Sequence, residues 1–401
     1  MRSVEEHQRV VAGLIAARPA AIAGLADAEG RVLSDDVIAT VSLPVFDNSA
    51  MDGYAVRADE IASAAPDHPV ELPVAEDIPA GRTDIPTLDP GTAHRIMTGA
   101  PVPAGATAIV PVEATDGRID RVRISSPSSE GRHIRRAGED VAAGSTVLRA
   151  GQVITPAVVG LAAALGLHGL AVIPRQRVLI VSTGSELVSP GTPLRPGQIY
   201  ESNSPMLAAA VRDAGADVVA AAVVSDDVAE FTALLDRYAA DSDLIVTSGG
   251  VSAGAYEVVK DAFGRVGDQG VEFVKVAMQP GMPQGAGRVA GTPIVTLPGN
   301  PVSALVCFEV FIRPPLRSAM GLPDPHRPRR SAVLTEELTA PAGKRQFRRG
   351  IFDAAAGTVA SCGPPGSHHL RWLASANCLL DIPADVTELP ADSRVQIWVL
   401  R

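Results

Sequence analysis

Three loops that follow predicted strands carry residues suited to binding a phosphate-containing ligand. They read STGSE (182–186), TSGGVSAG (247–254) and TLPGNP (296–301), and each follows a short apolar run typical of a buried strand. Glycine lets backbone N–H groups approach an anion, and a helix that begins in such a loop adds partial positive charge. One loop of this kind is as often a tight turn as a binding site.

Acidic and basic side chains accompany these loops. Glu186, Asp227 and Glu257 are placed to hold Mg²⁺, which favours a few carboxylates together with phosphate oxygens. Lys260 and Lys275 could balance negative charge. Simpler interpretations stay open, since Glu186 and Asp227 could cap helices and Glu257 with Lys260 could form a surface ion pair.

The loops require a parallel sheet to bring them to one edge. Apolar runs alternate with helical patterns and lie at 178–181, 218–224, 244–247, 273–278 and 294–297. Ser204 is expected to cap a helix over 206–214, and Asn300 to cap one that begins at Pro301. This alternation predicts an α/β domain with a mostly parallel sheet, whose ligand lies at the carboxyl ends of the strands.

The flanking segments indicate other domains. A helix is predicted over 4–17, with Ser3 and Glu6 as a capping box, and 56–149 and 331–400 have the short runs and turns of β domains. The segment 313–328 is expected to be a proline-rich linker. The stretch 47–53 (DNSAMDG) is predicted to be a loop in which Asp47 and Asp52 hold a cation, orient a hydroxyl, or form Asx turns.

Composition limits the class of protein. A chain of 401 residues is expected to form two to four domains. Its net charge of −10 argues against non-specific binding to nucleic acid or an anionic membrane. Its 3 cysteines are too scattered for a disulfide framework or zinc site. With no signal peptide and no run of 18 apolar residues, a cytoplasmic location is the default expectation.

The motifs also narrow the chemistry. No glycine-rich loop ends in the Lys-Ser/Thr of an ATPase phosphate loop, and a GxGxxG pattern is missing from the sequence. No Ser-His-Asp or Cys-His arrangement stands out. Phosphoanhydride or oxyanion chemistry assisted by a metal is therefore favoured over acyl or hydride transfer.

A resemblance to a known family follows from these same motifs. The segment FDNSAMDGYAV (46–56) resembles the characteristic loop of the MoeA family, the molybdopterin molybdenumtransferases, which includes the E-domain of gephyrin. The resemblance continues in order through MTGAPVPAGA (97–106), GEDV (138–141), STGSEL (182–187), SNSPML (202–207), TSGGVSAG (247–254) and LPGNPVSA (297–304). It covers nearly the whole chain.

The resemblance implies a multidomain α/β plus β fold. The α/β domain, 175–320, would be similar to molybdopterin-adenylyltransferase proteins. A protruding β domain (45–146) would be inserted in an elongated linking domain (1–44 and 147–174), and 328–401 would form a C-terminal β-barrel. A homodimer with its active site between subunits is expected, and a molybdopterin adenylyltransferase is a possible upstream partner.

It also implies an activity: insertion of molybdenum from molybdate into adenylylated molybdopterin, with Mg²⁺ and release of AMP. Glu186, Asp227 and Glu257 would face the metal, Lys275 would lie in the substrate site, and Asp52, Thr98 and Asp140 would come from the partner subunit. Residues expected to contact the pterin nucleotide or molybdate are Thr183, Gly184, Ser202, Asn203, Ser204, Ser248, Gly249, Gly250, Ser252, Gly254, Lys260, Pro298, Gly299, Asn300, Pro301, Ser303, Lys344 and Ser367.

Departures from the family pattern leave other functions open. Gln279 and Met282 stand where many members have lysine, Glu257 where many have aspartate, and Lys344 where arginine is frequent. The lost lysines weaken the expected anion pocket, so another oxyanion such as tungstate is conceivable. The alternatives are a molybdopterin adenylyltransferase, which would transfer AMP from ATP without molybdate, and a non-catalytic pterin-binding or scaffold protein.

Overall fold

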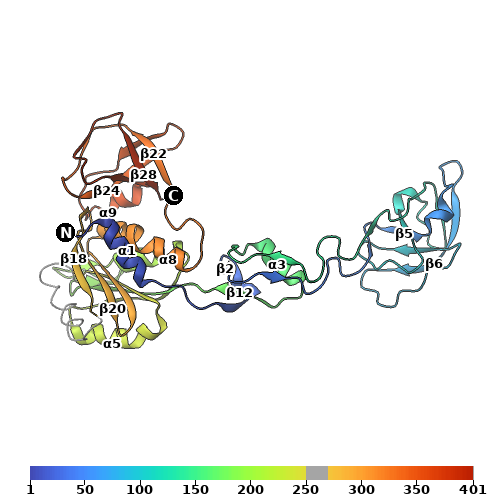
Figure 1. The fold of residues 1–401 in the computed structure, drawn as a ribbon, viewed down its shortest axis with the longest axis horizontal. Coiled ribbons are helices and arrows are strands. Elements are labelled where there is room, and N and C mark those ends of the chain that lie inside the picture. The colour runs from blue at the N-terminus through green and yellow to red at the C-terminus, as the bar shows by residue number, and fades with distance from the viewer. Residues whose placement is uncertain (250–269, 401) are drawn as a thin grey trace. The chain divides into compact units, whose positions relative to one another are not determined.

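The chain forms two compact units. A computed structural model describes residues 1–249 and 270–400. The first unit comprises 1–21, 30–32 and 172–401, and the second comprises 22–29 and 33–171 (Figure 1). No helix in the described ranges is long and apolar enough to span a bilayer.

A six-stranded α/β sheet is the centre of the first unit. Its order is β16-β13-β17-β21-β20-β18, and the first four strands are parallel, as predicted. The last two strands run antiparallel to their neighbours. Strand β20 was not predicted because its two glycines and one proline hide the apolar pattern. The strands are β13 (Arg177–Thr183), β16 (Asp217–Val224), β17 (Leu244–Ser248), β18 (Glu272–Lys275), β20 (Pro283–Val289) and β21 (Thr292–Leu297).

Helices cover both faces of this sheet, which explains why the parallel strands are continuous apolar runs. On one face, Val178, Val246 and Val295 pack in a core shared with the helices α1, α4 and α7. On the other, Leu179 and Ile245 pack against α5. The helices are α1 (Val4–Leu14), α4 (Asn203–Asp213), α5 (Val228–Tyr238) with the short η3 (Ala239–Asp241), and α7 (Pro301–Cys307).

Helix α1 begins with the predicted capping box. The Glu6 N–H donates to Ser3 Oγ at 3.1 Å, and the Ser3 N–H donates to Glu6 Oε2 at 2.9 Å. Val4 and Val11 then enter the core of the α/β sheet. The sequence-based assignment put 1–44 in a linking domain, whereas the structure packs α1 into the α/β layer.

Two predicted helix boundaries were wrong. The N-cap of α4 is Ser202 and not Ser204 as predicted. Ser204 lies in the first turn of the helix, where its N–H donates to the Glu201 carboxylate. The predicted linker after 313 begins instead as a helix, since α7 continues through the π-helix η4 (Phe308–Ile312) into α8 (Arg313–Ala319). Pro314 removes a helical N–H, and the Gln8 amide donates to the Val310 carbonyl at 3.2 Å in its place.

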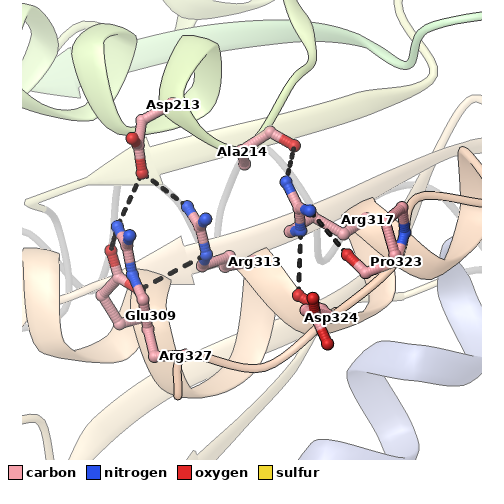
Figure 2. A network of polar contacts seen from close by, with 8 residues as sticks. All are labelled: Asp213, Ala214, Glu309, Arg313, Arg317, Pro323, Asp324 and Arg327. Carbon is pink, nitrogen blue, oxygen red and sulfur yellow. Dashed lines mark hydrogen bonds and ion pairs between the residues drawn. The ribbon is translucent and has the colours of Figure 1, made fainter. Parts of the chain in front are cut away.

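A partly buried ionic network holds this helix in position (Figure 2). Arg327 donates to both oxygens of Glu309 at 2.9 Å and to Asp213, at the end of α4, at 2.6 Å. Arg313 donates to the same Asp213 oxygen at 2.6 Å. Arg317 binds the backbone carbonyls of Ala214, Pro323 and Asp324. The network therefore joins α4, η4, α8 and the segment that leads to the C-terminal strands.

The C-terminal residues form the predicted β-barrel. The order β24-β25-β22-β28-β26 closes through the β24–β26 pairing. Strand β19 (Met278–Gln279) pairs with β24 in parallel and attaches the barrel to the α/β layer. The strands are β22 (Arg329–Leu334), β24 (Arg345–Asp353), β25 (Thr358–Ser361), β26 (Cys378–Ile382) and β28 (Arg394–Val399), with β23 (Leu338–Thr339), β27 (Glu388–Leu389) and helix α9 (Leu370–Ser375) beside them.

The second unit is built mainly of short strands, as predicted. Its strands are β1 (Ala21–Gly24), β2 (Val32–Leu33), β3 (Val37–Ile38), β4 (Asn48–Ser49), β5 (Gly53–Val56), β6 (Val70–Ile78), β7 (Ala93–Ile96), β8 (Ala108–Pro111), β9 (Arg121–Ile124), β10 (Ile134–Arg135), β11 (Thr146–Leu148) and β12 (Gly169–Ile173). Its helices are α2 (Leu25–Ala28) and α3 (Pro156–Ala164), with the short η1 (Ala58–Ile61) and η2 (Val112–Ala114). The largest sheet has the order β8-β5-β7-β6-β9. Thr155 caps α3, since its Oγ1 accepts from the Val158 N–H at 3.4 Å.

We expect His7 to make the first unit sensitive to acid. This residue of α1 is fully buried against Phe311, and burial lowers its pKa from 6.5 to about 4. Between these values the unfolded chain binds a proton that the folded protein does not, so stability falls as the pH drops from 6.5 to 4. The full effect is about 3 kcal/mol. Urea unfolding at pH 7 and pH 4.5 should show a smaller difference for His7→Phe than for the unaltered protein. An equal difference would contradict this assignment.

Candidate functional site

A polar cavity lies where β13, β17 and β21 end. Its volume is about 470 Å³, and it is lined by Thr183, Gly184, Glu186, Leu187, Ile199, Asn203, Asp226, Ser248, Gly249, Pro283, Pro298, Gly299 and Asn300. The three loops singled out in the sequence therefore meet at one edge of the sheet. Nine of these residues are among those named from the family resemblance, whereas Leu187, Ile199, Asp226 and Pro283 are not.

Close backbone contacts hold the loops together. The Gly249 N–H donates to the Leu297 carbonyl at 3.2 Å, and the Asn203 amide donates to the Gly299 carbonyl at 2.7 Å. A Cβ on Gly249 would lie 2.5 Å from the Thr183 carbonyl oxygen, and one on Gly299 would lie 3.3 Å from Gly249 Cα. The glycines thus serve loop–loop packing, and the Gly249 N–H, expected to face an anion, is used within the protein.

Gly249→Ala should lower stability strongly. Gly249 has φ +89°, and its methyl group would force β13 and β17 apart at the cavity. Gly197→Ala is a matched control, because Gly197 has φ +84° with open space around it. We expect a loss of about 1 kcal/mol for Gly197→Ala from backbone strain alone, and at least about twice that for Gly249→Ala. Urea unfolding would measure both, and equal losses would refute the packing role.

Two carboxylates line the cavity. Glu186 lies in the turn after β13, and Asp226 follows β16. Asp226 Oδ2 accepts from both the N–H and the hydroxyl of Ser185 at 3.1 Å, which ties the two turns together. Asp227 was predicted to face a metal, but its carboxylate accepts from Ala229 and Glu230 N–H groups and caps α5. Asp227 therefore caps a helix, which is one of the simpler interpretations of the sequence, and Asp226 lines the cavity.

The charge of the described lining is negative. Glu186 and Asp226 are its only ionisable residues in the described ranges, and none is basic. Lys275 is exposed on the outer strand β18 and is not part of the lining. No group of three or more potential metal ligands is found within 1–249 and 270–400. Gly250, Ser252, Gly254, Glu257 and Lys260, which the sequence placed here, lie outside the described residues.

Other predicted residues lie next to the cavity or elsewhere. Ser204 and Ser303 are buried in α4 and α7, Ser202 is the N-cap of α4, and Pro301 is the first residue of α7. The Ser367 carbonyl accepts from the Val302 N–H at 3.1 Å, so it lies beside the start of α7. Lys344 immediately precedes β24.

Beside Ser367, a small second cavity is lined partly by Arg348 and Arg349. It holds about 10 Å³ and is bounded by Gln279, Pro280, Val302, Gln346, Phe347, Arg348, Arg349 and Pro365. Arg349 is buried and donates to the carbonyls of Pro364 and Gly366. Its Nε and the Gln346 Oε1 have no partner among the described residues. Burial lowers the pKa of both Arg348 and Arg349.

The stretch 47–53 in the second unit, predicted to be a loop, contains the short strand β4 and the first residue of β5, and it orients a hydroxyl. Asp52 Oδ1 accepts from both the N–H and the hydroxyl of Thr98 at 2.7 Å, and these bonds lower the pKa of Asp52. Asp47 accepts from Arg136 and the Ala137 N–H. The carboxylates thus bind distant segments, unlike Asx turns. Asp140 is held by its backbone, since its N–H donates to the Leu43 carbonyl.

A mostly parallel α/β sheet with a polar cavity at its carboxyl edge, joined to a closed barrel, defines a multidomain α/β protein. Three family models match the chain in order: "MoeA N-terminal region (domain I and II)" at 2–166, "Probable molybdopterin binding domain" at 179–318 and "MoeA C-terminal region (domain IV)" at 331–400. The chain belongs to the MoeA family of molybdopterin molybdenumtransferases.

Individual relatives agree with this assignment. Molybdopterin molybdenumtransferase 2 of Mycobacterium tuberculosis is 74% identical over 405 residues, with 100% of both chains covered. Molybdopterin molybdenumtransferase 1 of the same species is 38% identical, covering 100% of this chain and 99% of its own. A crystal structure of the MoeA protein of Pyrococcus horikoshii has a TM-score of 0.80 at 27% identity, covering 100% of this chain and 99% of its own.

Proposed function

We propose that this chain is a transferase that inserts molybdenum from molybdate into molybdopterin, in the final step of molybdenum cofactor synthesis. The observation that carries the proposal is the cavity itself. The loops at the ends of β13, β17 and β21 form it, in a chain aligned over its full length with a molybdopterin molybdenumtransferase. Function is thus argued from the site as well as from the fold.

The substrate form that fits best is adenylylated molybdopterin, with AMP as a product. Its phosphates are anionic, whereas the described lining contributes two carboxylates and no basic residue. A divalent cation would resolve this mismatch, since Mg²⁺ is bound by one or two carboxylates plus substrate phosphates. Glu186 and Asp226 would hold it, and the ion would neutralise charge on the phosphates.

We further propose that the molybdate side lies toward the barrel. Arg349, Ser367 and Gln279 come together around the start of α7, where a buried guanidinium nitrogen and an amide oxygen have no partner among the described residues. The guanidinium N–H suits an oxyanion once the small cavity opens, whereas the amide oxygen is an acceptor and would need a donor instead. Lys344 and Lys275 remain candidates for the same anion.

The proposal extends to assembly and location. A homodimer would complete the active site with Asp52, Thr98 and Asp140 of the partner subunit, and the Asp52–Thr98 bonds already hold that pair in a fixed geometry. A molybdopterin adenylyltransferase would supply the substrate, and the reaction would take place in the cytoplasm.

An anaerobic assay tests this function. The protein is incubated with adenylylated molybdopterin, MgCl₂ and either molybdate or tungstate, and both AMP and pterin-bound metal are measured. We expect AMP release that depends on the oxyanion and a matching amount of bound metal. Adenylyl transfer from ATP to molybdopterin without an oxyanion would instead favour an adenylyltransferase. Full rescue of cofactor synthesis by Glu186→Gln would favour a non-catalytic role.

A further inference from the structure

A buried carboxylate that the proposed chemistry does not use lies beneath the cavity. Glu201 follows strand β15 (Ile199–Tyr200), which pairs with β14 (Leu187–Val188), and it is 3% exposed. Its Oε1 accepts from the Ser204 N–H and from the Ser182 hydroxyl, each at 2.8 Å. A buried charge persists only where hydrogen bonds compensate it, so this carboxylate constrains its neighbours.

The Ser182 hydroxyl is the centre of a cluster of three serines. Its oxygen lies 2.8 Å from Ser204 Oγ and 2.9 Å from Ser248 Oγ. A hydroxyl has one proton and two lone pairs. Because the Ser182 proton goes to Glu201, Ser248 must donate to Ser182 at their contact. The Ser204 hydroxyl can donate to Ser182 or to the Ala222 carbonyl, which lies 3.5 Å away.

This chain of bonds fixes the direction of the Ser248 hydroxyl. Its proton points inward to Ser182, and its lone pairs are left for the cavity whose wall it forms. Asn203 adds a second acceptor: its Nδ2 is used by the Gly299 carbonyl, and its Oδ1 has no partner among the described residues. Thr183 Oγ1 also lacks a partner there and can donate or accept.

We propose that Glu201 is a positioning residue that keeps Ser248 a hydrogen-bond acceptor, so that Ser248 and Asn203 bind an N–H or O–H donor edge of the ligand. The proposal rests on the proposed function, which supplies such an edge in the pterin ring, with its ring N–H groups and exocyclic amine. An acceptor-only group such as phosphate is disfavoured at this wall, which leaves phosphate to the Glu186 and Asp226 carboxylates and their cation.

Neutron diffraction from deuterium-exchanged crystals of the full chain tests the hydroxyl directions without any ligand. We expect the Ser182 deuteron on the line to Glu201 Oε1 and the Ser248 deuteron on the line to Ser182 Oγ. A Ser248 deuteron directed into the cavity would overturn the inference and would leave the proposed function unaffected.

Binding of adenylylated molybdopterin to the full chain tests the consequence. Ser182→Ala frees the Ser248 proton, and Ser248→Ala removes the acceptor, so each should raise Kd about 5- to 30-fold. In turnover the change should appear in KM, with kcat within about twofold. Glu201→Gln should give a smaller rise in Kd, because the amide keeps the shape of the carboxylate but can donate to Ser182.

Thr247→Val is the matched control. Thr247 is the neighbouring residue of β17, is fully buried, and its hydroxyl has no partner among the described residues. Successive residues of a strand point to opposite faces, so this change should leave Kd unaltered. If the unaltered protein binds and the Ser182 and Ser248 variants bind equally well, the inference is overturned. If the unaltered protein fails to bind, the proposed function fails instead.

Discussion

The double substitution Glu186→Gln and Asp226→Asn should lower the rate of AMP release by about 100- to 1,000-fold. The two carboxylates are the only charged groups of the described lining, and the variant removes both charges at nearly constant shape. Loss of the cation that they would hold is expected to cost several kcal/mol of transition-state stabilisation. Single-turnover assays with saturating substrate and increasing MgCl₂ would measure the effect and any partial rescue by the metal.

A comparison of neighbouring single variants sharpens this test. Asp226 lines the cavity, whereas the Asp227 carboxylate caps α5. Asparagine is also a good helix cap, so Asp227→Asn should change stability little. We therefore expect Asp226→Asn to slow AMP release much more than Asp227→Asn. The reverse order would show that the metal-facing acid is Asp227 and that the cavity rearranges when substrate binds.

Glu309→Ala should destabilise the first unit by about 3–5 kcal/mol, the usual cost of breaking a buried ion pair by removing one partner. Glu309 is 4% exposed, and its two carboxylate oxygens accept hydrogen bonds from Nε and Nη2 of Arg327 (Figure 2). Its removal would leave Arg313, which is 7% exposed, beside Arg327 with Asp213 as their one remaining carboxylate partner among the described residues. Urea unfolding at neutral pH would measure the loss.

Asp324→Asn provides the control for that prediction. Arg317 binds Asp324 through its backbone carbonyl, so the side chain is not part of this contact. The control should therefore unfold at nearly the same urea concentration as the unaltered protein. A Glu309→Ala loss below about 1 kcal/mol, within the range of surface ion pairs, would mean that the network does not anchor η4 and α8.

Much of the fold could be predicted because local pattern and tertiary packing agree. The apolar runs at 178–181 and 244–247 became β13 and β17 since both faces of the sheet are covered. Ser3 with Glu6 marked a helix start correctly, because this capping box depends only on nearby residues. The closed barrel was expected from the alternating pattern together with the family resemblance.

The remaining features depend on contacts between distant segments. Prolines at 314 and 315 suggested a linker, yet Gln8 supplies a donor to the helix that they would interrupt. Asp226 and Asp227 are adjacent acids, and their hydrogen bonds separate their roles: Asp226 accepts from Ser185, whereas Asp227 caps α5. The role of Glu201 could not be predicted, because its burial beneath three serines has no sequence signal.

A crystal structure of the full chain with adenylylated molybdopterin and Mg²⁺ would test the central claim most directly, that the edge where β13, β17 and β21 end is the binding site. The account predicts pterin density against Ser248 and Asn203, with the phosphates and metal at Glu186 and Asp226. Density confined to another cavity, such as the apolar one of about 450 Å³ between α1 and α8, would contradict it.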